Sequence, residues 1–321
     1  MDQIGVDIQI TMDTKKVAVI VTVYNEAPTL IPFLEALKKQ TFSAKEVILV
    51  DGGSTDDTLL LAQKFSRNWK TLKVYHQPGN RSVGRNFAIA HTQCQIIAIT
   101  DAGCLPHSDW LAQIIKPFSS PETKVVSGYY EGRWNNIFQK CLIPFVLVMP
   151  NKAEKTEFYP STRSMALYRS AWLAAGGFNT NLSHNEDYAF AHRLKRLGYD
   201  FTFAKSAIVT WLPRKNLKQA AWMFMRFAIG DIQAGILRPQ VKRLAIRFLS
   251  FMFLFFLSFQ LSFIIPIVIL LSLIYIIVSI FKNYRYVRDI RALYWLPVIQ
   301  LTADLSVLFG SVVGLLSAVY T

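Results

Sequence analysis

The chain has 321 residues, of which 52% are hydrophobic, and its formal net charge is +14. This composition excludes a disordered chain and a small disulfide scaffold, and the length allows one sizeable domain with further segments. The positive charge favours an anionic partner, which could be nucleic acid, a phosphate-bearing substrate or an acidic membrane face. The three cysteines have no metal-ligand spacing and cannot all pair, which is typical of a reducing compartment.

The first sixteen residues are expected to form an N-terminal extension. They carry Asp2, Asp7 and Asp13 before any apolar run, and a secretory signal is not built in this way. The domain that follows, residues 17–212, is therefore expected to remain in the cytoplasm.

Residues 17–212 alternate short β-rich apolar runs with helical patterns, which predicts an α/β fold with a mostly parallel, Rossmann-like sheet. Predicted strands cover residues 17–23, 47–50 and 96–99. Helical patterns lie between them at residues 30–37, 59–65 and 83–90. Ligands of such sheets gather where the strands end, so the loops 22–26, 51–57 and 100–104 are expected to share one edge.

Two aspartates end predicted strands in this domain. Asp51 could accept hydrogen bonds from a base or a ribose, although aspartate also forms turns and helix caps. Asp101 is followed by Ala102 and Gly103, which leave space for a ligand. Mg²⁺ or Mn²⁺ commonly uses one or two carboxylates and completes its shell with water and diphosphate oxygens, so Asp101 is a candidate metal ligand.

Two further groups of polar residues could serve the same site. Arg81, Arg85 and Asn86 lie just before and within a predicted helix, where guanidinium groups could pair with phosphate oxygens. A solvated basic helix end is the alternative. Glu186 and Asp187 open an amphipathic helical run, where acids can simply cap the helix. Beside a nucleotide site, such a carboxylate would suit a general base.

The last third of the chain predicts a membrane region. Residues 248–281 carry no charged side chain, and residues 292–321 carry only Asp304. One helix over the first run would be about 51 Å long and too steeply tilted for a ~30 Å bilayer core. Two short spans are therefore favoured, followed by a third. The alternative is one interfacial helix followed by one span. The expected spans are about 248–264, 265–281 and 293–320.

Residues 213–247 are expected to form basic amphipathic helices at the membrane interface. Over residues 205–247, nine lysines and arginines face a single acid, Asp231, so more than half of the net charge lies beside the apolar runs. This placement favours anionic membrane lipids or a lipid-linked phosphate over nucleic acid. Leu217, Ala221, Phe224 and Ala228 form an apolar line at helical spacing, typical of a helix on the bilayer surface. Packing on the soluble domain is the alternative.

Together these motifs resemble a family-2 glycosyltransferase of the GT-A fold, over about residues 15–235. The matching segments occur in the family's order: VTVYNEAPTL, VILVDGGSTDDT, GNRSVGRNFAIA, IAITDAGC with DWL, AAGGFNTNLSHNEDYAFAHRLKRLGYDF, TWLPRKNL and RFAIGD.

The resemblance implies a role for each candidate residue. Those bordering the base and ribose of a nucleotide sugar would be Thr22, Tyr24, Glu26 and, contacting the base, Asp51. Those along its diphosphate or ribose would be Arg81, Arg85 and Asn86. Asp101 matches the first acid of the family's Asp-x-Asp metal motif, with Ala102 and Gly103 beside the donor. Asp187 matches the catalytic base, with Glu186 beside it.

The chain departs from the family pattern in two places. Gly103 replaces the second acid of Asp-x-Asp, so metal ligation would rest on Asp101 and the diphosphate. The Gln-x-x-Arg-Trp signature of processive synthases is missing, although Arg226 and Phe227 lie near its expected position, so processive synthesis is disfavoured. Arg163 and residues 211–214 resemble features of membrane-anchored members, without an assigned role.

The function implied by the resemblance is inverting transfer of a sugar from a nucleotide-sugar donor to a lipid or lipid-linked saccharide, with Mg²⁺ or Mn²⁺. The setting would be cell-envelope glycan synthesis by an integral membrane protein whose catalytic domain is cytoplasmic. A polyprenyl-phosphate glycosyltransferase is one alternative. A catalytically decayed, membrane-anchored sugar-nucleotide-binding protein is the other, and a nucleic-acid partner is not expected.

Overall fold

The computed structural model describes residues 17–153, 157–182 and 184–319. The N-terminal extension expected at residues 1–16 lies outside the described residues. The chain forms two compact units. The first takes the chain up to residue 130 together with 157–180 and 190–210, and the second takes 131–156, 181–189 and 211–321. Two segments of the domain expected at 17–212 thus belong with the C-terminal helices.

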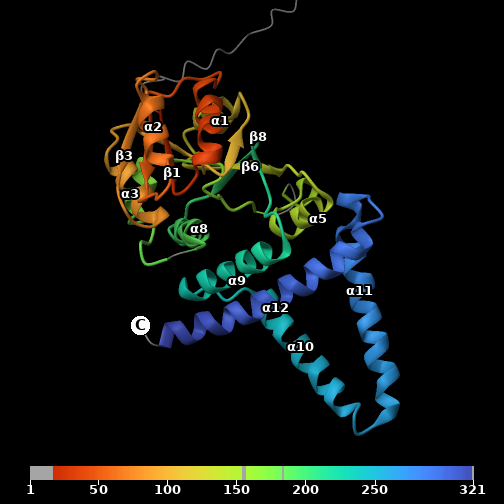
Figure 1. Cartoon of the computed structure of the whole chain (residues 1–321). Helices are drawn as coiled ribbons and strands as arrows, with labels where there is room; N and C mark the ends of the chain where they lie inside the picture. The colour runs from red at the N-terminus through yellow and green to blue at the C-terminus, as the bar shows by residue number, and fades with distance from the viewer. Residues whose placement is uncertain (1–16, 154–156, 183, 320–321) are drawn as a thin grey trace, which may run out of the picture. The chain divides into compact units, whose positions relative to one another are not determined.

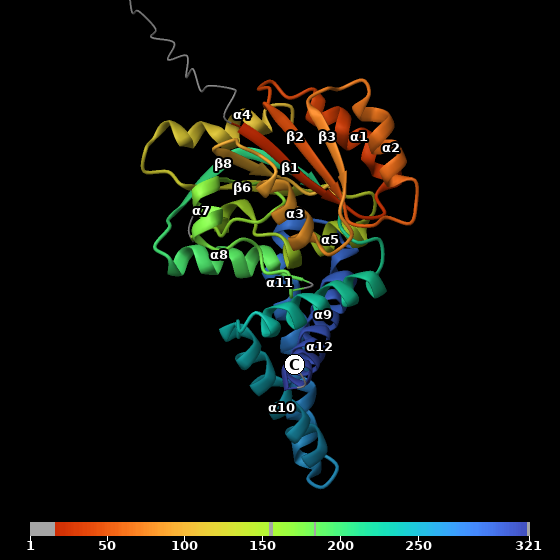
Figure 2. The same ribbon diagram turned by 90° about the vertical axis from the view of Figure 1, so that its left-hand side faces the viewer.

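An eight-stranded sheet forms the centre of the first unit, in the order β3-β2-β1-β4-β7-β6-β8-β5. Its strands are β1 (Val17–Val23), β2 (Glu46–Asp51), β3 (Leu72–His76), β4 (Ile96–Ile99), β5 (Cys104–Pro106), β6 (Val125–Gly132), β7 (Met165–Tyr168) and β8 (Phe201–Trp211). Strands β1 to β4 pair in parallel, and β7 runs antiparallel to both β4 and β6. The sheet is therefore mixed, and the expected α/β fold class is confirmed (Figure 2).

The central strands β1, β2 and β4 are buried on both faces, as their apolar sequences predict. Ala18 and Ile20 of β1 pack into one core cluster with Ala88 and Ile89 of helix α3. The helices of the first unit are α1 (Ala27–Lys38), α2 (Thr58–Ser66), α3 (Arg81–Ala90), α4 (Trp110–Ile115), α7 (Arg169–Ala174) and the main part of α8 (Glu186–Arg196), with a 3-10 helix at Lys116–Ser119. Because β1 to β4 run parallel, their carboxyl ends all lie at one edge of the sheet, where the loops that follow them can meet.

The second unit is helical. It contains α5 (Ile137–Val146), α6 (Pro150–Ala153), α9 (Leu217–Gln233), α10 (Pro239–Leu257), a 3-10 helix at Ser262–Ile264, α11 (Ile265–Val287) and α12 (Ala292–Val319). Figure 1 shows α9 lying along α12. Two glycines of α12 allow this close approach, because an added Cβ would lie 2.4 Å from the Met225 carbonyl oxygen at Gly310 and 2.9 Å from Ile232 at Gly314.

Packing against α12 therefore buries one side of helix α9. Phe224 and Ala228 of its predicted apolar line are buried, whereas Leu217 and Ala221 are half-buried. The exposed side carries Lys218, Trp222 and Arg226, with the Arg226 guanidinium 5.3 Å from the Trp222 ring. A helix lying on a bilayer with its whole apolar line would show the opposite exposure.

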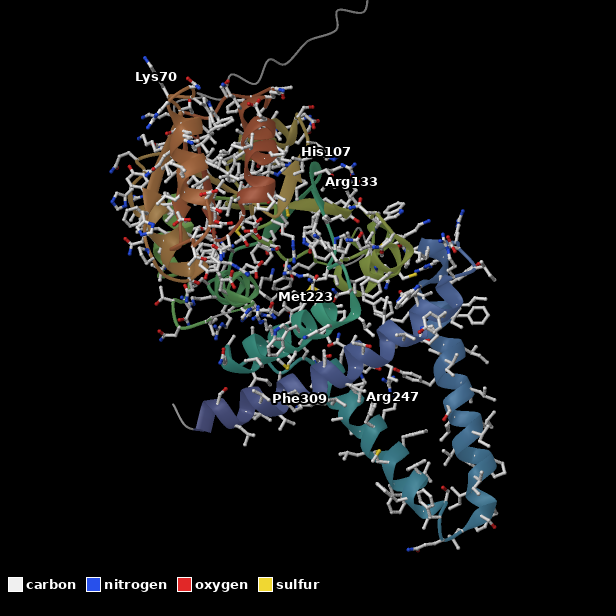
Figure 3. The ribbon with its side chains drawn as sticks, viewed as in Figure 1. Lys70, His107, Arg133, Met223, Arg247 and Phe309 are labelled. Atoms are coloured by element: carbon white, nitrogen blue, oxygen red, sulfur yellow. The ribbon has the colours of Figure 1, made fainter. Side chains whose placement is uncertain are left out.

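Two helical segments of the second unit are long and apolar enough to cross a membrane, residues 262–287 and 292–317. The preceding helix, α10, has no buried residue within the described chain. Asp304 of α12 joins all three helices, because it accepts hydrogen bonds from Arg247 of α10 (labelled in Figure 3), Tyr275 of α11 and Gln300. Whether two or three helices cross a membrane stays a prediction.

Candidate active site

The first unit brings the predicted polar loops together at the carboxyl ends of β1, β2 and β4. Strand register places Val23 beside Asp51, and β4 pairs with the other side of β1. Asn25, in the left-handed region with φ 54°, ties the first two loops together. The backbone N–H of Asn25 donates to Ser54 Oγ at 2.9 Å, and its side-chain Oδ1 accepts the backbone N–H of Thr55 at 2.8 Å. These hydrogen bonds therefore fix the first two loops relative to each other.

The three residues expected to border the base and ribose lie on or just after β1. Tyr24 is 58% exposed, whereas Thr22 and Glu26 are half-buried. Glu26 is fixed at both ends, since its N–H donates to Thr58 Oγ1 at 2.8 Å and its Oε2 accepts from Thr29 Oγ1 at 2.8 Å. Tyr24 is thus the most exposed of the three, and its contact with a base stays a prediction.

Asp51 is fully buried and organises its own loop. Its Oδ2 accepts the N–H groups of Gly53 and Ser54 and the Nδ1–H of His76, each at 3.0 Å. Burial raises the pKa of Asp51, but the hydrogen bonds from Ser54, His76 and Gly53 outweigh it, so the pKa lies below its ordinary value. The other oxygen, Oδ1, is buried without a hydrogen-bond partner among the described residues. An unmet buried acceptor is what a base N–H would satisfy.

Asp101 faces a group of arginines. Its Oδ1 accepts from Arg85 Nη2 at 2.8 Å, and its Oδ2 lies 3.5 Å from Thr162 Oγ1. Burial raises the pKa of Asp101, but the charges of Arg85, Arg81 and Arg163 outweigh it, so the pKa is held below its ordinary range. The carboxylate is therefore ionised at neutral pH, as a metal ligand must be.

Arg85 is buried, whereas its partner Asp101 is partly exposed. Its side chain is 1% exposed, against 30% for Asp101, and its guanidinium lies 5.6 Å from the Phe178 ring. Arg81, one turn earlier, is exposed. A contact between Arg85 and a diphosphate stays a prediction, and in this structure Arg85 supports Asp101.

Asn86 is turned into the protein. Its Oδ1 accepts from Trp172 Nε1 at 3.1 Å and from the Phe178 N–H at 2.8 Å, and its Nδ2 donates to the Phe178 carbonyl at 2.8 Å. These bonds fasten α3 to the loop that follows α7. The expected placement of Asn86 along the donor stays untested, but its described hydrogen bonds are structural.

Of the two residues that follow Asp101, Gly103 leaves open space and Ala102 is buried. Ala102 is 4% exposed, and a Cβ added to Gly103 would meet no described atom within 4 Å. No cluster of three or more His, Cys, Asp or Glu occurs in the part of the chain that the structure describes. These residues fit a cation held by one carboxylate oxygen whose shell is completed by water and diphosphate, but they do not form an all-protein metal cage.

The structure places Arg163, which could not be assigned a role from the sequence, near the end of β4. It lies in the turn before β7, its guanidinium is 5.4 Å from the Tyr130 ring, and its carbonyl oxygen accepts from Thr100 Oγ1 at 2.9 Å. Because β7 pairs antiparallel with β4, the residues just before β7 arrive at the end of β4 beside Asp101. An antiparallel strand cannot be recognised by counting strand–helix repeats, so sequence reasoning left Arg163 without a role.

Asp187 and Glu186 belong to the second unit and start α8. Glu186 is buried, with 3% of its surface exposed, and Asp187 is half-buried. The Oδ1 of Asp187 accepts the Tyr188 N–H at 2.8 Å. One oxygen therefore serves the first turn of the helix, in line with the capping alternative, and the carboxylate is at the same time held in a fixed orientation.

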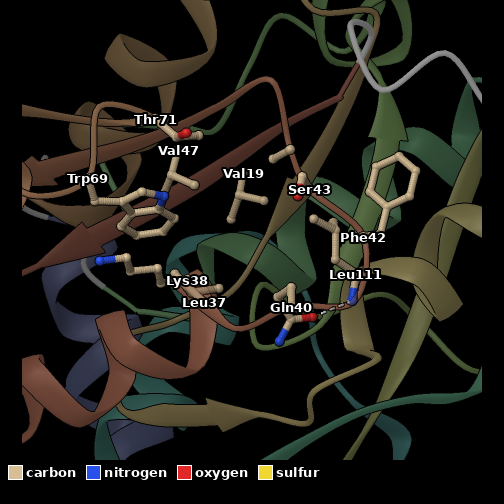
Figure 4. Close-up of a pocket in the computed structure, with 11 residues that line it drawn as sticks. Val19, Leu37, Lys38, Gln40, Phe42, Ser43, Val47, Trp69, Thr71 and Leu111 are labelled. Atoms are coloured by element: carbon tan, nitrogen blue, oxygen red, sulfur yellow. Dashed lines mark hydrogen bonds between the residues drawn. The ribbon is translucent and has the colours of Figure 1, made fainter.

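A small hollow in the first unit lies away from these residues. Its lining, shown in Figure 4, includes Val19, Leu37, Gln40, Trp69 and Leu111, and none of the predicted site residues. Val47 and Thr71, at the starts of β2 and β3, also line it. The hollow is thus at the amino ends of the strands, opposite the edge where ligands of parallel sheets bind.

Residues 18–174 match the family profile described as Glycosyl transferase family 2. The chain is 27% identical over 228 residues to the glycosyltransferase AglE of Haloferax volcanii, covering 69% of this chain and 74% of that protein. It is 26% identical over 222 residues to the O-antigen chain rhamnosyltransferase RfbN of Salmonella typhimurium, covering 64% and 70%. Among solved structures, the mannosyltransferase PcManGT from Pyrobaculum calidifontis in complex with GDP-Man and Mn²⁺ matches with a TM-score of 0.58 at 20% identity, covering 92% and 87%.

Proposed function

We propose that this chain, whose residues 18–174 match the family described as Glycosyl transferase family 2, is a glycosyltransferase of the GT-A fold that moves a sugar from a nucleotide-sugar donor to a membrane-associated acceptor with inversion. The observation that carries the proposal is the hydrogen bond from the buried Arg85 to the partly exposed carboxylate of Asp101, at the edge where the loops 22–26, 51–57 and 100–104 meet. The Asp101 side chain is 30% exposed, so its carboxylate is accessible to a ligand. This accessibility suits a donor site.

The donor nucleotide would bind along the ends of β1 and β2. Tyr24 offers a ring for stacking, and the unpartnered Oδ1 of Asp51 offers an acceptor for the base. Arg81, exposed at the start of α3, would lie near the diphosphate. The solved structure of PcManGT, which contains GDP-Man, supports a nucleotide-sugar donor.

A divalent cation would be held by Asp101. When bound, such an ion supplies positive charge to the departing diphosphate. The chain's own contribution is to keep Asp101 ionised and fixed, which Arg85 and Arg163 do through charge. The Mn²⁺ in the PcManGT complex supports this part of the proposal.

Asp187 would act as the general base. It takes the proton from the acceptor hydroxyl while that oxygen forms a bond to the anomeric carbon. The bond from this carbon to the diphosphate oxygen breaks, and the nucleoside diphosphate leaves with the bonding electrons. A positioned base typically contributes ~10²–10⁴-fold to such a step.

The acceptor would be a lipid or lipid-linked saccharide at the cytoplasmic membrane face. Two segments of membrane-spanning length, residues 262–287 and 292–317, follow the catalytic region. Arg285 lies near the end of the first, Arg288 and Arg291 lie between the two, and Lys242 and Arg243 lie in the preceding helix α10. Similarity to an O-antigen chain rhamnosyltransferase supports a role in envelope glycan synthesis. Anionic headgroups would complement the flanking charge.

A panel of nucleotides and nucleotide sugars tests the donor site. Thermal shifts of the full chain in detergent, with and without Mn²⁺, identify the donor that stabilises it most. That donor is then given to protein in anionic phospholipid vesicles that contain a polyprenyl-diphosphate-linked sugar, and product formation is measured.

Asp101→Asn should lose Mn²⁺-dependent donor binding, and Asp187→Asn should keep donor binding and lose transfer. Asp200→Asn, which removes a carboxylate that is 94% exposed, is the matched control and should leave both unchanged. Donor binding without turnover would favour the decayed binding protein. Transfer to vesicles containing polyprenyl phosphate, unaffected by Asp187→Asn, would favour an acceptor that is already ionised.

A further inference from the structure

The backbone around Asp187 is fastened to helix α9 within the second unit. Asn185 adopts the left-handed conformation, with φ 55°, which asparagine tolerates better than most residues. Its Nδ2 donates to the Phe227 carbonyl and to Asp231 Oδ1, both at 2.9 Å. Gly230 permits the contact, because an added Cβ would lie 2.3 Å from the His184 carbonyl oxygen. The segment 184–188 therefore packs directly on the last turns of α9.

Asp231 also holds Arg238, the residue just before α10. Arg238 Nε donates to Asp231 Oδ2 at 2.6 Å, and its Nη2 donates to Oδ1 at 3.0 Å, which forms a two-point ion pair. Asp231 is only 7% exposed. The Arg238 guanidinium lies 4.2 Å from the ring of Tyr188, a cation–π distance. Asp187 is thus bracketed, with Asn185 bound to Asp231 on one side and Tyr188 covered by Arg238 on the other.

The turn between α9 and α10 brings Arg238 back to Asp231. Helix α9 ends in a Schellman motif. The Ile236 N–H donates to the Asp231 carbonyl oxygen at 2.8 Å, and the Gly235 N–H donates to the Ile232 carbonyl oxygen at 2.9 Å. Gly235 has φ 70°, which a glycine accepts without strain. Both the main chain and the side chain of Asp231 therefore fix the start of α10.

We propose that Asp231 and Arg238 are positioning residues for the transfer reaction, which hold the segment 184–188 and orient the carboxylate of Asp187. This inference rests on the proposed role of Asp187 as the base. Neither residue needs to touch the donor or the acceptor. Loss of the ion pair frees Asn185 and Tyr188, and a displacement of about 1 Å in a catalytic group can cost ~100-fold in rate.

The test compares Asp231→Asn, Arg238→Gln and Arg238→Lys with the unaltered chain, in the vesicle assay and in donor binding by calorimetry. We expect Arg238→Gln and Asp231→Asn to lower kcat about 10–100-fold with donor Kd changed less than about threefold. Arg238→Lys keeps the charge without the two-point geometry and should fall between. Lys195→Gln, which removes an ion pair at the far end of α8, is the matched control and should keep the original kcat.

Each result has a defined meaning. Unchanged kcat in folded Asp231→Asn and Arg238→Gln, with Asp187→Asn inactive, overturns the positioning role and leaves the proposed base intact. Parallel loss of kcat and donor binding also overturns it, because the pair would then support the fold in general. If both variants fail to fold, Arg238→Lys decides, and an unchanged kcat there refutes the proposal. Full activity of Asp187→Asn would instead remove the proposed base itself.

Discussion

Arg85 Nη2 donates to Asp101 Oδ1 over 2.8 Å, which links the middle of α3 to the end of β4. The arginine is almost fully buried, and the aspartate is the more exposed partner. The charge of this buried guanidinium is the largest influence that keeps the carboxylate ionised, and the charges of Arg81 and Arg163 add to it.

Replacement of Arg85 by glutamine should therefore make donor binding sensitive to pH. In the unaltered chain the pKa of Asp101 lies below its ordinary 3.8, so its charge, and the stability it contributes, persist above that value and are lost only as pH falls through the lowered pKa. In Arg85→Gln burial is opposed by fewer charges, and the pKa rises. Mn²⁺-dependent donor binding by calorimetry should then decline between pH 7 and 5, while the unaltered chain stays constant.

Arg67→Gln, which removes an exposed arginine at the end of α2, is the control for Arg85→Gln. It should show the flat pH profile of the unaltered chain. The unfolding free energy of Arg85→Gln should also fall by about 3 kcal/mol, because a partly buried carboxylate loses its partner. A flat binding profile in Arg85→Gln would mean that Asp101 does not depend on this contact.

A change of Asp51 to asparagine should loosen the loop that follows β2. The amide side chain can keep one acceptor oxygen, but the charge that draws the Gly53 and Ser54 N–H groups and His76 is gone. Unfolding free energy should fall by roughly 1–3 kcal/mol, and nucleotide binding should weaken with it. The lowered pKa of Asp51 places its stabilising contribution above pH 3.8. Denaturant titrations should therefore show the largest difference between the two chains at neutral pH and a smaller one near pH 3.

The edge of the sheet could be predicted because it follows from local rules. Asp51 and Asp101 each end a β-rich apolar run, and parallel strands with alternating helices must place such ends together. What each side chain does there could not be predicted in the same way. Asn86 bonds to Phe178, 92 positions along the chain, and Asn185 bonds to Asp231, 46 positions along. No local periodicity encodes these pairings.

Which segments belong to which unit could not be predicted from the sequence either. The described residues of 131–153 and 181–189 lie inside the expected catalytic domain by sequence, yet they belong to the same unit as the C-terminal helices. In α9, the charge pattern favoured a helix with one free apolar line, but glycines at positions 310 and 314 of α12 provide a surface for it. A glycine in an apolar helix does not reveal from sequence which partner it admits.

Gly103 offers a direct test of how this site uses metal. An aspartate here would restore the second acid of the Asp-x-Asp pattern, and the space around the added Cβ is open among the described atoms. We therefore expect Gly103→Asp to change stability by less than about 0.5 kcal/mol. A second carboxylate should strengthen Mn²⁺-dependent donor binding. Gly103→Asn, of the same shape without the charge, should not. Equal effects of the two variants would show that the added carboxylate does not reach the cation.

Asp304 should contribute to the second unit through its partners instead of through its charge alone. It is 7% exposed on α12 and accepts from Arg247, Tyr275 and Gln300 at 2.5, 3.0 and 2.8 Å. Asp304→Leu leaves three donors without their shared acceptor, so the unfolding free energy in detergent should fall by roughly 2–3 kcal/mol. Arg247→Leu should cost less, because its side chain is 52% exposed and the acid keeps two other donors. The double variant should recover part of the loss, since apolar residues then replace both charges. Additive losses in this double-mutant cycle, followed by thermal unfolding, would show that Arg247 and Asp304 do not act as a pair.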